Sequence, residues 1–460
     1  MKLSKKGYLI EKKDNDEKIY ELKDELTVLP VKNYLFKDDN NKPFPIYREN
    51  DKYLIIPKFY GIGKFGLPKK IKYPKLEKRD FNFKGELKDY QYDIINKIYP
   101  KILNQEGGTL SVGCGRGKTV MGIYIACQLK VKTLIMVHAD FLMNQWKERI
   151  EMFSDASIGI IKQKKIDTDK DIIIGMLQSI AKEKYDKEIF KDIGLVIFDE
   201  AHRAPSKFFS KALPLITSQY QLALSATPIR EDKMEKILYW YFGPIIYQEE
   251  RGKDNRINVR CYYFESKDKK FKISLLPFGK GINISKTTNN IVLINERNNL
   301  IIKLINEIIE ENPKRKILML SDRIKHLEEI KKGINNYTID FYIGKMKPKE
   351  LEESSKCQII LGTYQMASEA LDIPDLNCLI MGTSKKKVEQ SIGRILRKNQ
   401  EINPLIIDII DNLDSLKNQG EKRINYYLKH DYQINYYQVI DNKIELIEKK
   451  ATTNDDLFLD

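Results

Sequence analysis

Cysteine and histidine are scarce in this sequence, which has five cysteines and four histidines among 460 residues. The cysteines are scattered, with no Cys-x-x-Cys pair and no histidine beside them. This pattern argues against a zinc site or a disulfide framework and indicates a reducing compartment.

Long apolar runs are also missing, since none approaches the roughly 18 residues that a membrane helix needs. The first stretch, MKLSKKGYLIEKKD, is basic but lacks the apolar core of a signal peptide. We therefore expect no membrane association and a cytosolic protein, or a nuclear one if its cell has a nucleus.

Acidic residues are outnumbered, with 65 Asp and Glu against 80 Lys and Arg, and the formal net charge is +15. Such a charge favours a polyanionic partner such as nucleic acid, although it also suits mere solubility. The composition is that of a globular protein, with 42% apolar residues available for several cores. At roughly 150 residues per domain, the length suggests about three domains.

Residues 1–83 are predicted to form a separate mixed α/β module. The stretch 44–68 alternates apolar and polar residues, which is typical of short strands broken by proline and glycine turns. The module ends in a basic run over residues 64–80. Such a run is usually a solvated linker, and direct contact with phosphates is the alternative.

Residues 84–246 alternate between apolar runs that end in polar residues and stretches with helical spacing. Repeated units of this kind predict a parallel sheet covered on both faces, which binds ligands at the carboxyl ends of its strands. The expected strands lie at 109–113, 133–137, 172–176, 195–200 and 221–227.

A second series predicts another parallel α/β domain over residues 290–425. Its expected strands lie at 316–321, 338–344, 357–363, 376–383 and 404–410. Residues 247–289 are polar and only partly strand-like, so we expect a connector there. The tail, 426–460, is rich in tyrosine and then acidic, and we expect it to be frayed. The fold class is therefore α/β, with two tandem parallel-sheet domains and a small N-terminal module.

The stretch VGCGRGKTV (112–120) follows the first expected strand of the first domain. A strand, a glycine turn and the start of a helix point backbone N–H groups and the helix dipole at an anion. Gly115 and Gly117 let the backbone approach phosphates, Lys118 can neutralise the β and γ phosphates, and the Thr119 hydroxyl can bind Mg²⁺. The longer form of this motif would need glycine at Val112, and a plain turn before a helix is the alternative.

The second motif is DEAH (199–202), at the end of the strand LVIF. Asp199 is expected to bind Mg²⁺, and Glu200 to orient and deprotonate an attacking water. An isolated Asp-Glu pair at a strand end can be a helix cap. This pair follows the glycine loop by about 80 residues in the same predicted sheet, which favours the catalytic role.

The third motif is QSIGRILRK (390–398), in the second domain. Arg394 and Arg397 lie three residues apart and hence on one face of a helix. Two such arginines can stabilise the charge on a γ-phosphoryl group in transfer. Surface salt bridges are the alternative for Arg397. The pairing of these arginines with the glycine loop suggests that ATP is held between the two domains.

Taken together, these residues resemble those of superfamily 2 helicases and translocases, which have two RecA-like domains. The similarity covers about residues 84–425 in the order typical of the family. The matching segments are LKDYQ (87–91), GRGKT (115–119), VHADFLMNQW (137–146), MLQSI (176–180), DEAH, SAT (225–227), LMLSDR (318–323), GTYQMASEALDIP (362–374) and QSIGRILR (390–397).

This resemblance implies roles on the nucleotide side. Gln91 would recognise adenine, and Arg116 belongs to the phosphate-binding loop. Gln390 would lie near the γ-phosphate, and Asp372 would contact the ribose or position the arginines.

It also implies roles on the nucleic-acid side. Ser225 and Thr227 would link the ATP state to the nucleic acid, with His202 joining the DEAH segment to them. Gln178 and Thr363 would contact backbone phosphates, which gives binding that ignores sequence and depends steeply on salt. Trp146 and the paired tyrosines near 426 and 436 could stack on bases, with packing as the alternative.

The subgroup is suggested by IREDK, in which Arg230 opens an Arg-Glu-Asp motif similar to that of the translocase subunit of the general transcription and repair factor. The N-terminal segment and EQSIGRILRK look closer to helicases of large nucleocytoplasmic DNA viruses, including the poxvirus transcript-release helicase. Two positions depart from the family pattern, since Ala370 stands where glycine is common and Lys88 where arginine is common. We expect neither residue to contact the groups needed for hydrolysis.

We therefore expect a monomeric ATP- and Mg²⁺-dependent DNA helicase or translocase, moving 3′ to 5′ in transcription, replication or repair. An RNA helicase, or an ATP-switched scaffold subunit of a larger complex, are the alternatives. RNA or an RNA polymerase are further candidate partners. A viral protein of this kind would work in a viral factory or virion.

Overall fold

The chain divides into two compact units, Met1–Glu250 and Arg251–Asp460, each with its own central sheet. The computed structural model describes residues 1–12, 17–29, 42–113, 115–182, 185–203, 206, 208–226, 233–249, 252–277, 281–344, 346–369, 373, 375–386, 388–395 and 401–448. Within these residues, no helix is long and apolar enough to cross a membrane.

The N-terminal part of the first unit is a small mixed sheet with two helices. Its strands lie in the order β5 (Arg48–Glu49), β6 (Tyr53–Ile56), β2 (Gly7–Glu11), β1 (Lys2–Ser4) and β7 (Ile71–Lys72). A separate pair joins β3 (Thr27–Val28) to β4 (Phe44–Pro45), and the helices are α1 (Glu17–Glu25) and α2 (Lys58–Phe65). The expectation of strands throughout 44–68 is therefore wrong for α2. Pro57 precedes this helix, and Gly61 lets it pack directly on the Tyr8 ring.

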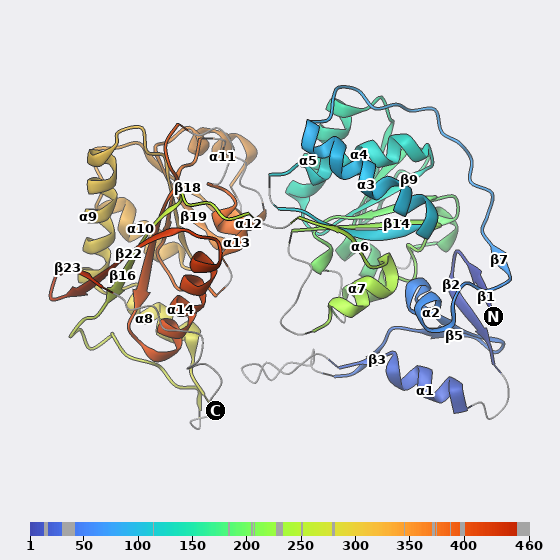
Figure 1. The fold of residues 1–460 in the computed structure, drawn as a ribbon, viewed down its shortest axis with the longest axis horizontal. Helices are drawn as coiled ribbons and strands as arrows, with labels where there is room; N and C mark the ends of the chain where they lie inside the picture. The colour runs from blue at the N-terminus through green and yellow to red at the C-terminus, as the bar shows by residue number, and fades with distance from the viewer. Residues whose placement is uncertain are drawn as a thin grey trace. The chain divides into compact units, whose positions relative to one another are not determined.

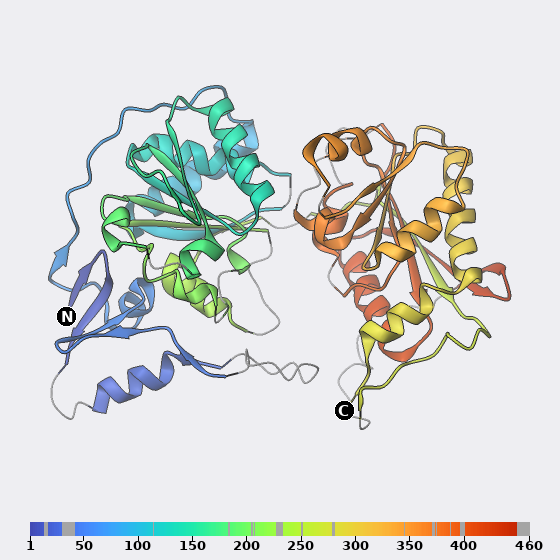
Figure 2. The ribbon, with the colours of Figure 1, turned by 180° about the vertical axis from the view of Figure 1, so that it is seen from behind.

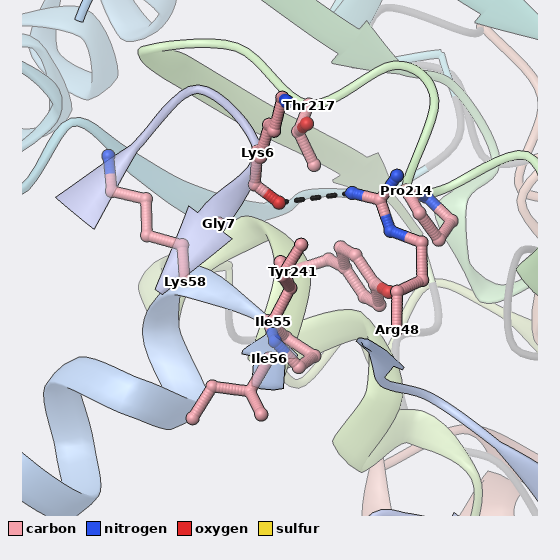
Figure 3. A pocket seen from close by; sticks show the side chains of 10 residues that line it. Lys6, Gly7, Arg48, Ile55, Ile56, Lys58, Pro214, Thr217 and Tyr241 are labelled. Atoms are coloured by element: carbon pink, nitrogen blue, oxygen red, sulfur yellow. Dashed lines mark hydrogen bonds between the residues drawn. The ribbon is translucent and has the colours of Figure 1, made fainter. Parts of the chain in front are cut away.

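This N-terminal part packs against the larger sheet of the same unit. The buried Lys58 amine lies 2.6 Å from Glu106 Oε2, and the Tyr241 hydroxyl donates to the carbonyl of Ile46. Within the N-terminal part, Arg48 donates to the carbonyl of Lys6 beside a crevice that residues of both parts line (Figure 3). The crevice is lined by Pro57 from one part and by Pro214, Thr217 and Tyr241 from the other, so it lies at their interface.

The central sheet of the first unit has eight strands, all parallel to their neighbours except for the β10–β11 hairpin. Their order is β11 (Lys165–Ile166), β10 (Ile158–Lys162), β12 (Ile172–Met176), β9 (Thr133–Val137), β13 (Leu195–Phe198), β14 (Tyr220–Ser225), β8 (Gly107–Ser111) and β15 (Ile245–Gln248).

Helices cover both faces of this sheet, as Figures 1 and 2 show for α3 (Asp89–Gln105), α4 (Lys118–Leu129) and α5 (Asp140–Phe153) on one face and α7 (Glu235–Phe242) on the other. The short α6 (Leu177–Lys182) lies with α7. Alternate residues of each strand enter the two cores, so Ile135 and Ile197 face α3–α5 while Met136 and Val196 face α6–α7. Burial on both faces explains why the strands are continuously apolar.

The second unit repeats this architecture, with parallel pairing except in the β22–β23 hairpin. Its strands lie in the order β18 (Ile339–Tyr342), β19 (Ile359–Thr363), β17 (Ile317–Ser321), β20 (Cys378–Met381), β21 (Leu405–Asp411), β16 (Asn258–Phe264), β22 (Gln433–Ile440) and β23 (Lys443–Ile447). One core contains residues of α8 (Ile284–Ile291), α9 (Asn295–Glu311) and α10 (Ile324–Lys332). The other contains residues of α12 (Tyr364–Glu369), α13 (Glu389–Ile392) and α14 (Asp414–Lys429), with α11 (Pro348–Ser355) beside it.

The predicted α/β class and all ten expected strands are confirmed. Two expectations about the second unit are wrong. The region 247–289, expected as a connector, contributes β16 to the middle of the sheet. The tail from 426, expected to be frayed, contributes β22 and β23, and its residues 449–460 lie outside the described residues. The strand β16 pairs with β21 and β22 along its whole length. These partners lie far away in sequence, so the local pattern of residues does not reveal the pairing. The other predicted domain limits stay predictions.

Two fully buried arginines fasten helices to β21. Arg297 of α9 donates two hydrogen bonds to Asp411, at 2.6 and 3.0 Å, and Arg423 of α14 donates two to Asp408. Removing one member of such a pair leaves an uncompensated buried charge.

We expect Arg297→Met to lower the free energy of unfolding of the second unit by about 3–5 kcal/mol, measured by urea denaturation. The double variant Arg297→Met with Asp411→Leu should recover most of that loss, because it removes both charges. Lys314→Met, which breaks an exposed pair with Glu401, should change stability by about 1 kcal/mol or less. A double variant as unstable as the single one would contradict this explanation.

Candidate functional site

The glycine loop joins β8 to α4, with the first turn of α4 at Lys118. Gly115 and Gly117 have φ of +75° and +76°, a region that other residues enter only at a cost. A Cβ on Gly117 would also lie 2.0 Å from Nε2 of Gln91. The loop therefore needs glycine at these positions, as predicted.

Gln91 connects the start of α3 to this loop. Its Oε1 accepts a hydrogen bond from the Lys88 backbone N–H at 3.0 Å, and its Nε2 donates to the Arg116 carbonyl at 3.2 Å. The side chain that the resemblance assigns to adenine thus also fixes the loop. Gln91 and Arg116 are 25 residues apart in sequence, and the fold brings the start of α3 against the loop.

Lys118 extends across the mouth of the loop, with its Nζ 3.2 Å from the carbonyl of Val112 and 3.5 Å from that of Gly113. Thr119 is half-buried in the same first turn of α4. A free helix end, a flexible ammonium group and a hydroxyl together suit a phosphate with its metal ion.

Glu249 is a residue of this site that the sequence did not single out. It directly follows β15, and its Oε2 accepts from the Gly113 N–H at 3.0 Å while its Oε1 lies 2.6 Å from Nε of Arg116. The Arg116 guanidinium also lies over the Tyr90 ring, 3.9 Å from its centroid. A carboxylate therefore occupies the phosphate-binding loop. No motif signals it, because β15 joins β8 only through the sheet.

Asp199 and Glu200 stand at the carboxyl end of β13, and β14 alone separates β13 from β8 in the sheet. Asp199 is almost fully buried. Its Oδ2 accepts from the Trp146 indole at 2.8 Å, and its Oδ1 accepts from the Glu200 N–H at 2.9 Å. Burial, with the neighbouring Glu200 charge as the next cause, raises the pKa of Asp199 to about 6.

Glu200 has φ of +48°, a left-handed conformation that costs about 1–3 kcal/mol and is typical of functional sites. Its Oε2 lies 3.3 Å from Nδ1 of His202, and the same nitrogen lies 3.3 Å from Oγ of Ser225 at the end of β14. The expected proximity of His202 and Ser225 is therefore present. Their role in linking the state of ATP to the nucleic acid stays a prediction.

Two residues expected to contact nucleic acid, Gln178 and Trp146, make other contacts in this structure. Gln178 is exposed, but its amide donates to the carbonyl of His138. Trp146 is fully buried, and so is Tyr427, whose hydroxyl donates to Asp408. The alternative of packing is confirmed for these two aromatic residues, and base stacking by them is excluded.

In the second unit, Arg394 follows α13, and its Nε donates to the carbonyl of Ala367 in α12 at 2.7 Å. Thr363 ends β19, and its Oγ1 accepts from the Met366 N–H. Gln390 belongs to α13. The hydrogen bond from Arg394 joins the segments 362–369 and 390–394. Thr227, Arg230, Asp372 and Arg397 lie outside the described residues.

The described residues of the first unit fit ATP with Mg²⁺. The loop provides a helix end and an ammonium group for phosphates, and Asp199 with Thr119 provides oxygen ligands of the kind that Mg²⁺ prefers. Burial raises the pKa of the Asp199 carboxyl, and a bound metal ion would favour its charged form.

We expect Asp199→Asn to stabilise the first unit while abolishing ATP hydrolysis. The unfolded pKa of an aspartate is about 3.9, so between about pH 4 and pH 6 the folded chain holds a proton that the unfolded chain has lost, and stability falls as pH rises. At pH 7.5 the variant should be more stable by on the order of 2–3 kcal/mol in urea denaturation. The difference should vanish near pH 4. A less stable variant at pH 7.5 would mean that the carboxylate stabilises the fold.

We expect Glu249→Gln to tighten nucleotide binding, because the carboxylate repels a triphosphate and already engages Arg116 and Gly113. The affinity for a fluorescent ATP analogue should rise about fivefold, or roughly 1 kcal/mol, and the gain should shrink in high salt. Glu148→Gln, on the exposed side of α5, serves as the matched control. Weaker binding by Glu249→Gln would show that the carboxylate supports the nucleotide.

Two family models match the chain. Residues 84–230 match the family described as "Type III restriction enzyme, res subunit", and residues 297–399 match "Helicase conserved C-terminal domain". Together they cover more than half of the chain and every predicted site residue.

Individual relatives extend over the same region. A protein of Acanthamoeba polyphaga mimivirus, provisionally named an ATP-dependent RNA helicase, is 38% identical over all of this chain and 90% of its own length. A DNA 3′–5′ translocase of Sulfurisphaera tokodaii is 26% identical over 71% of this chain and 82% of its own. Among solved structures, the ATP-dependent Type ISP restriction-modification enzyme LlaBIII bound to DNA has the same fold, with a TM-score of 0.56 and 15% identity. That match covers 78% of this chain and 32% of the enzyme.

Proposed function

Because the chain belongs to the superfamily 2 helicases, whose two motor domains hydrolyse ATP, we propose that it couples ATP hydrolysis to movement along DNA. The observation that carries this proposal is the convergence of Lys118, Asp199 and Glu200 at one edge of the first sheet. These groups would bind a nucleotide, and Glu200 would be the base for its hydrolysis, which a protein that only binds ATP as a switch would not need.

In the first unit, the N–H groups of residues 115–119 and Lys118 would hold the phosphates, while Gln91 would contact the base. Thr119 and Asp199 would hold Mg²⁺, which supplies charge neutralisation for the phosphates when bound. Glu200 would then accept the proton of the attacking water. Its strained backbone and its distance from His202 set where that carboxylate points.

The second unit carries the remaining residues that we propose for catalysis. Arg394 and Arg397 would stabilise the charge that develops on the γ-phosphoryl group, with Gln390 near that group and Asp372 beside the ribose or the arginines. The bond of Arg394 to Ala367 supports this proposal, because it ties the arginine to the segment that follows Thr363. A movement of nucleic acid against Thr363 could thereby reach the arginine.

Nucleic acid would contact backbone-binding residues in both units. Gln178 and Thr363 would bind phosphates, and the chain from Glu200 through His202 to Ser225 and Thr227 would report the state of ATP, with Arg230 nearby in sequence. Such contacts predict binding that ignores base sequence, and the formal charge of +15 supports a polyanionic track.

The proposal also specifies which nucleic acid the chain moves along. The Sulfurisphaera relative is named a DNA 3′–5′ translocase, and we propose DNA and the same direction for this chain. The name of the mimivirus relative favours RNA instead, so an RNA helicase is the second candidate. We further propose a monomer that works in transcription, replication or repair, alone or beside an RNA polymerase, in the cytoplasm, a viral factory or a virion, or the nucleus.

The test is the steady-state ATPase rate without nucleic acid and with single-stranded DNA, double-stranded DNA or RNA. DNA should strongly stimulate the ATPase rate of wild type. Glu200→Gln should lower the stimulated rate at least about 100-fold, and Glu148→Gln should have the wild-type rate. Stimulation by RNA alone would establish the RNA helicase. If no nucleic acid stimulates the ATPase rate and Glu200→Gln has the wild-type rate, the alternative of a scaffold switched by ATP binding is supported.

A further inference from the structure

Trp146 is buried at the centre of the first unit, with the whole of its indole out of contact with solvent. It belongs to α5, which covers the same face of the sheet as α4. Its Nε1 reaches the carboxyl end of β13 and donates to Oδ2 of Asp199 at 2.8 Å. Of the two tryptophans in the chain, it is thus the one beside the acidic pair.

This bond and one other define the orientation of the Asp199 carboxylate. Oδ2 receives the indole N–H, and Oδ1 receives the backbone N–H of Glu200. The two donors come from different elements, α5 and the strained turn after β13. With one donor on each oxygen, the plane of the carboxylate is fixed before any cation arrives.

The same indole touches the helix of the phosphate loop. A Cβ on Gly122 of α4 would lie 3.1 Å from Cη2 of Trp146, and 3.6 Å from Cδ1 of Ile197 in β13. The absence of a side chain at Gly122 therefore lets the ring fit between α4 and β13. Thr119 stands one turn earlier on α4, so the ring spaces the two elements that carry the proposed Mg²⁺ oxygens.

We propose that Trp146 is a positioning residue for Mg²⁺, which orients the Asp199 carboxylate through its indole N–H and sets the spacing of that carboxylate from α4. This inference rests on the proposed function in one respect, that Asp199 holds Mg²⁺. Partners that orient the ligands of a metal ion commonly account for a 10–100-fold effect on metal affinity.

A role in packing alone makes a different prediction. A phenylalanine would fill most of the same apolar space, and its ring offers no donor to Asp199. If packing were the whole role, Trp146→Phe would lower stability without a selective effect on Mg²⁺. If the N–H orients the carboxylate, the variant loses affinity for Mg²⁺ even where it remains folded.

The test compares wild type with Trp146→Phe, using mant-ADP that is excited directly so that the lost indole does not affect the signal. The concentration of Mg²⁺ that half-saturates mant-ADP binding should rise about tenfold or more in the variant. Binding of mant-ADP in excess EDTA should not change. Met143→Leu, another core substitution on α5, should leave the Mg²⁺ dependence at the wild-type value.

A second measurement keeps Trp146 and so does not depend on how well that variant folds. Trp240 lies apart from the site, beside Tyr60, and Trp240→Phe leaves Trp146 as the only indole. Its emission should shift when Mg²⁺ is added to the ADP-bound protein, and the shift should be lost with Asp199→Ala.

The outcomes separate the two proposals. If wild type binds mant-ADP without any effect of Mg²⁺, the proposed metal site and this inference both fail. If wild type depends on Mg²⁺ but Trp146→Phe shows the same dependence, or the emission of Trp146 ignores Mg²⁺, the inference fails alone. A selective shift in Mg²⁺ dependence together with the change in emission supports it.

Discussion

The parallel pairing of β8, β14 and β13 is the constraint on which the site depends. In register, Ser225 lies beside Ser111 and Phe198 beside Ala223, so the three strands end at one edge. The glycine loop, the acidic pair and Ser225 therefore meet although more than 100 residues of chain separate the first from the last. Charged groups gather at this edge at a cost, since Asp199 is buried and Glu200 is strained. The apolar cores on both faces of the sheet offset that cost.

Much of the fold could be predicted, because buried parallel strands produce continuous apolar runs that a sequence displays directly. The predicted membership of superfamily 2 and the resemblance to viral helicases are likewise confirmed by the comparisons. β16 escaped prediction as part of a domain because its partners β21 and β22 lie far along the chain. The helix α2 escaped because glycines at 61 and 63 suggest turns, whereas Gly61 actually serves close packing on Tyr8.

The site divides in the same way. Lys118, Asp199 and Glu200 are visible in the sequence because their chemistry requires fixed residue types at fixed spacing. Glu249 is not, since a carboxylate after an edge strand has no distinctive spacing, and the sequence marks Trp146 only as a candidate for base stacking or packing. Their roles arise from the tertiary structure, one through the bond to Gly113 and the other through the bond to Asp199. Such residues determine how the groups of the motifs are held.

The most direct measurement concerns the proposal that Arg394 stabilises the γ-phosphoryl group during hydrolysis. It is single-turnover hydrolysis of ATP by Arg394→Ala, with affinity for an ATP analogue measured on the same protein. We expect binding to stay within a few-fold of wild type while the rate of hydrolysis falls by about 10³-fold or more. Hydrolysis at the wild-type rate would contradict that proposal.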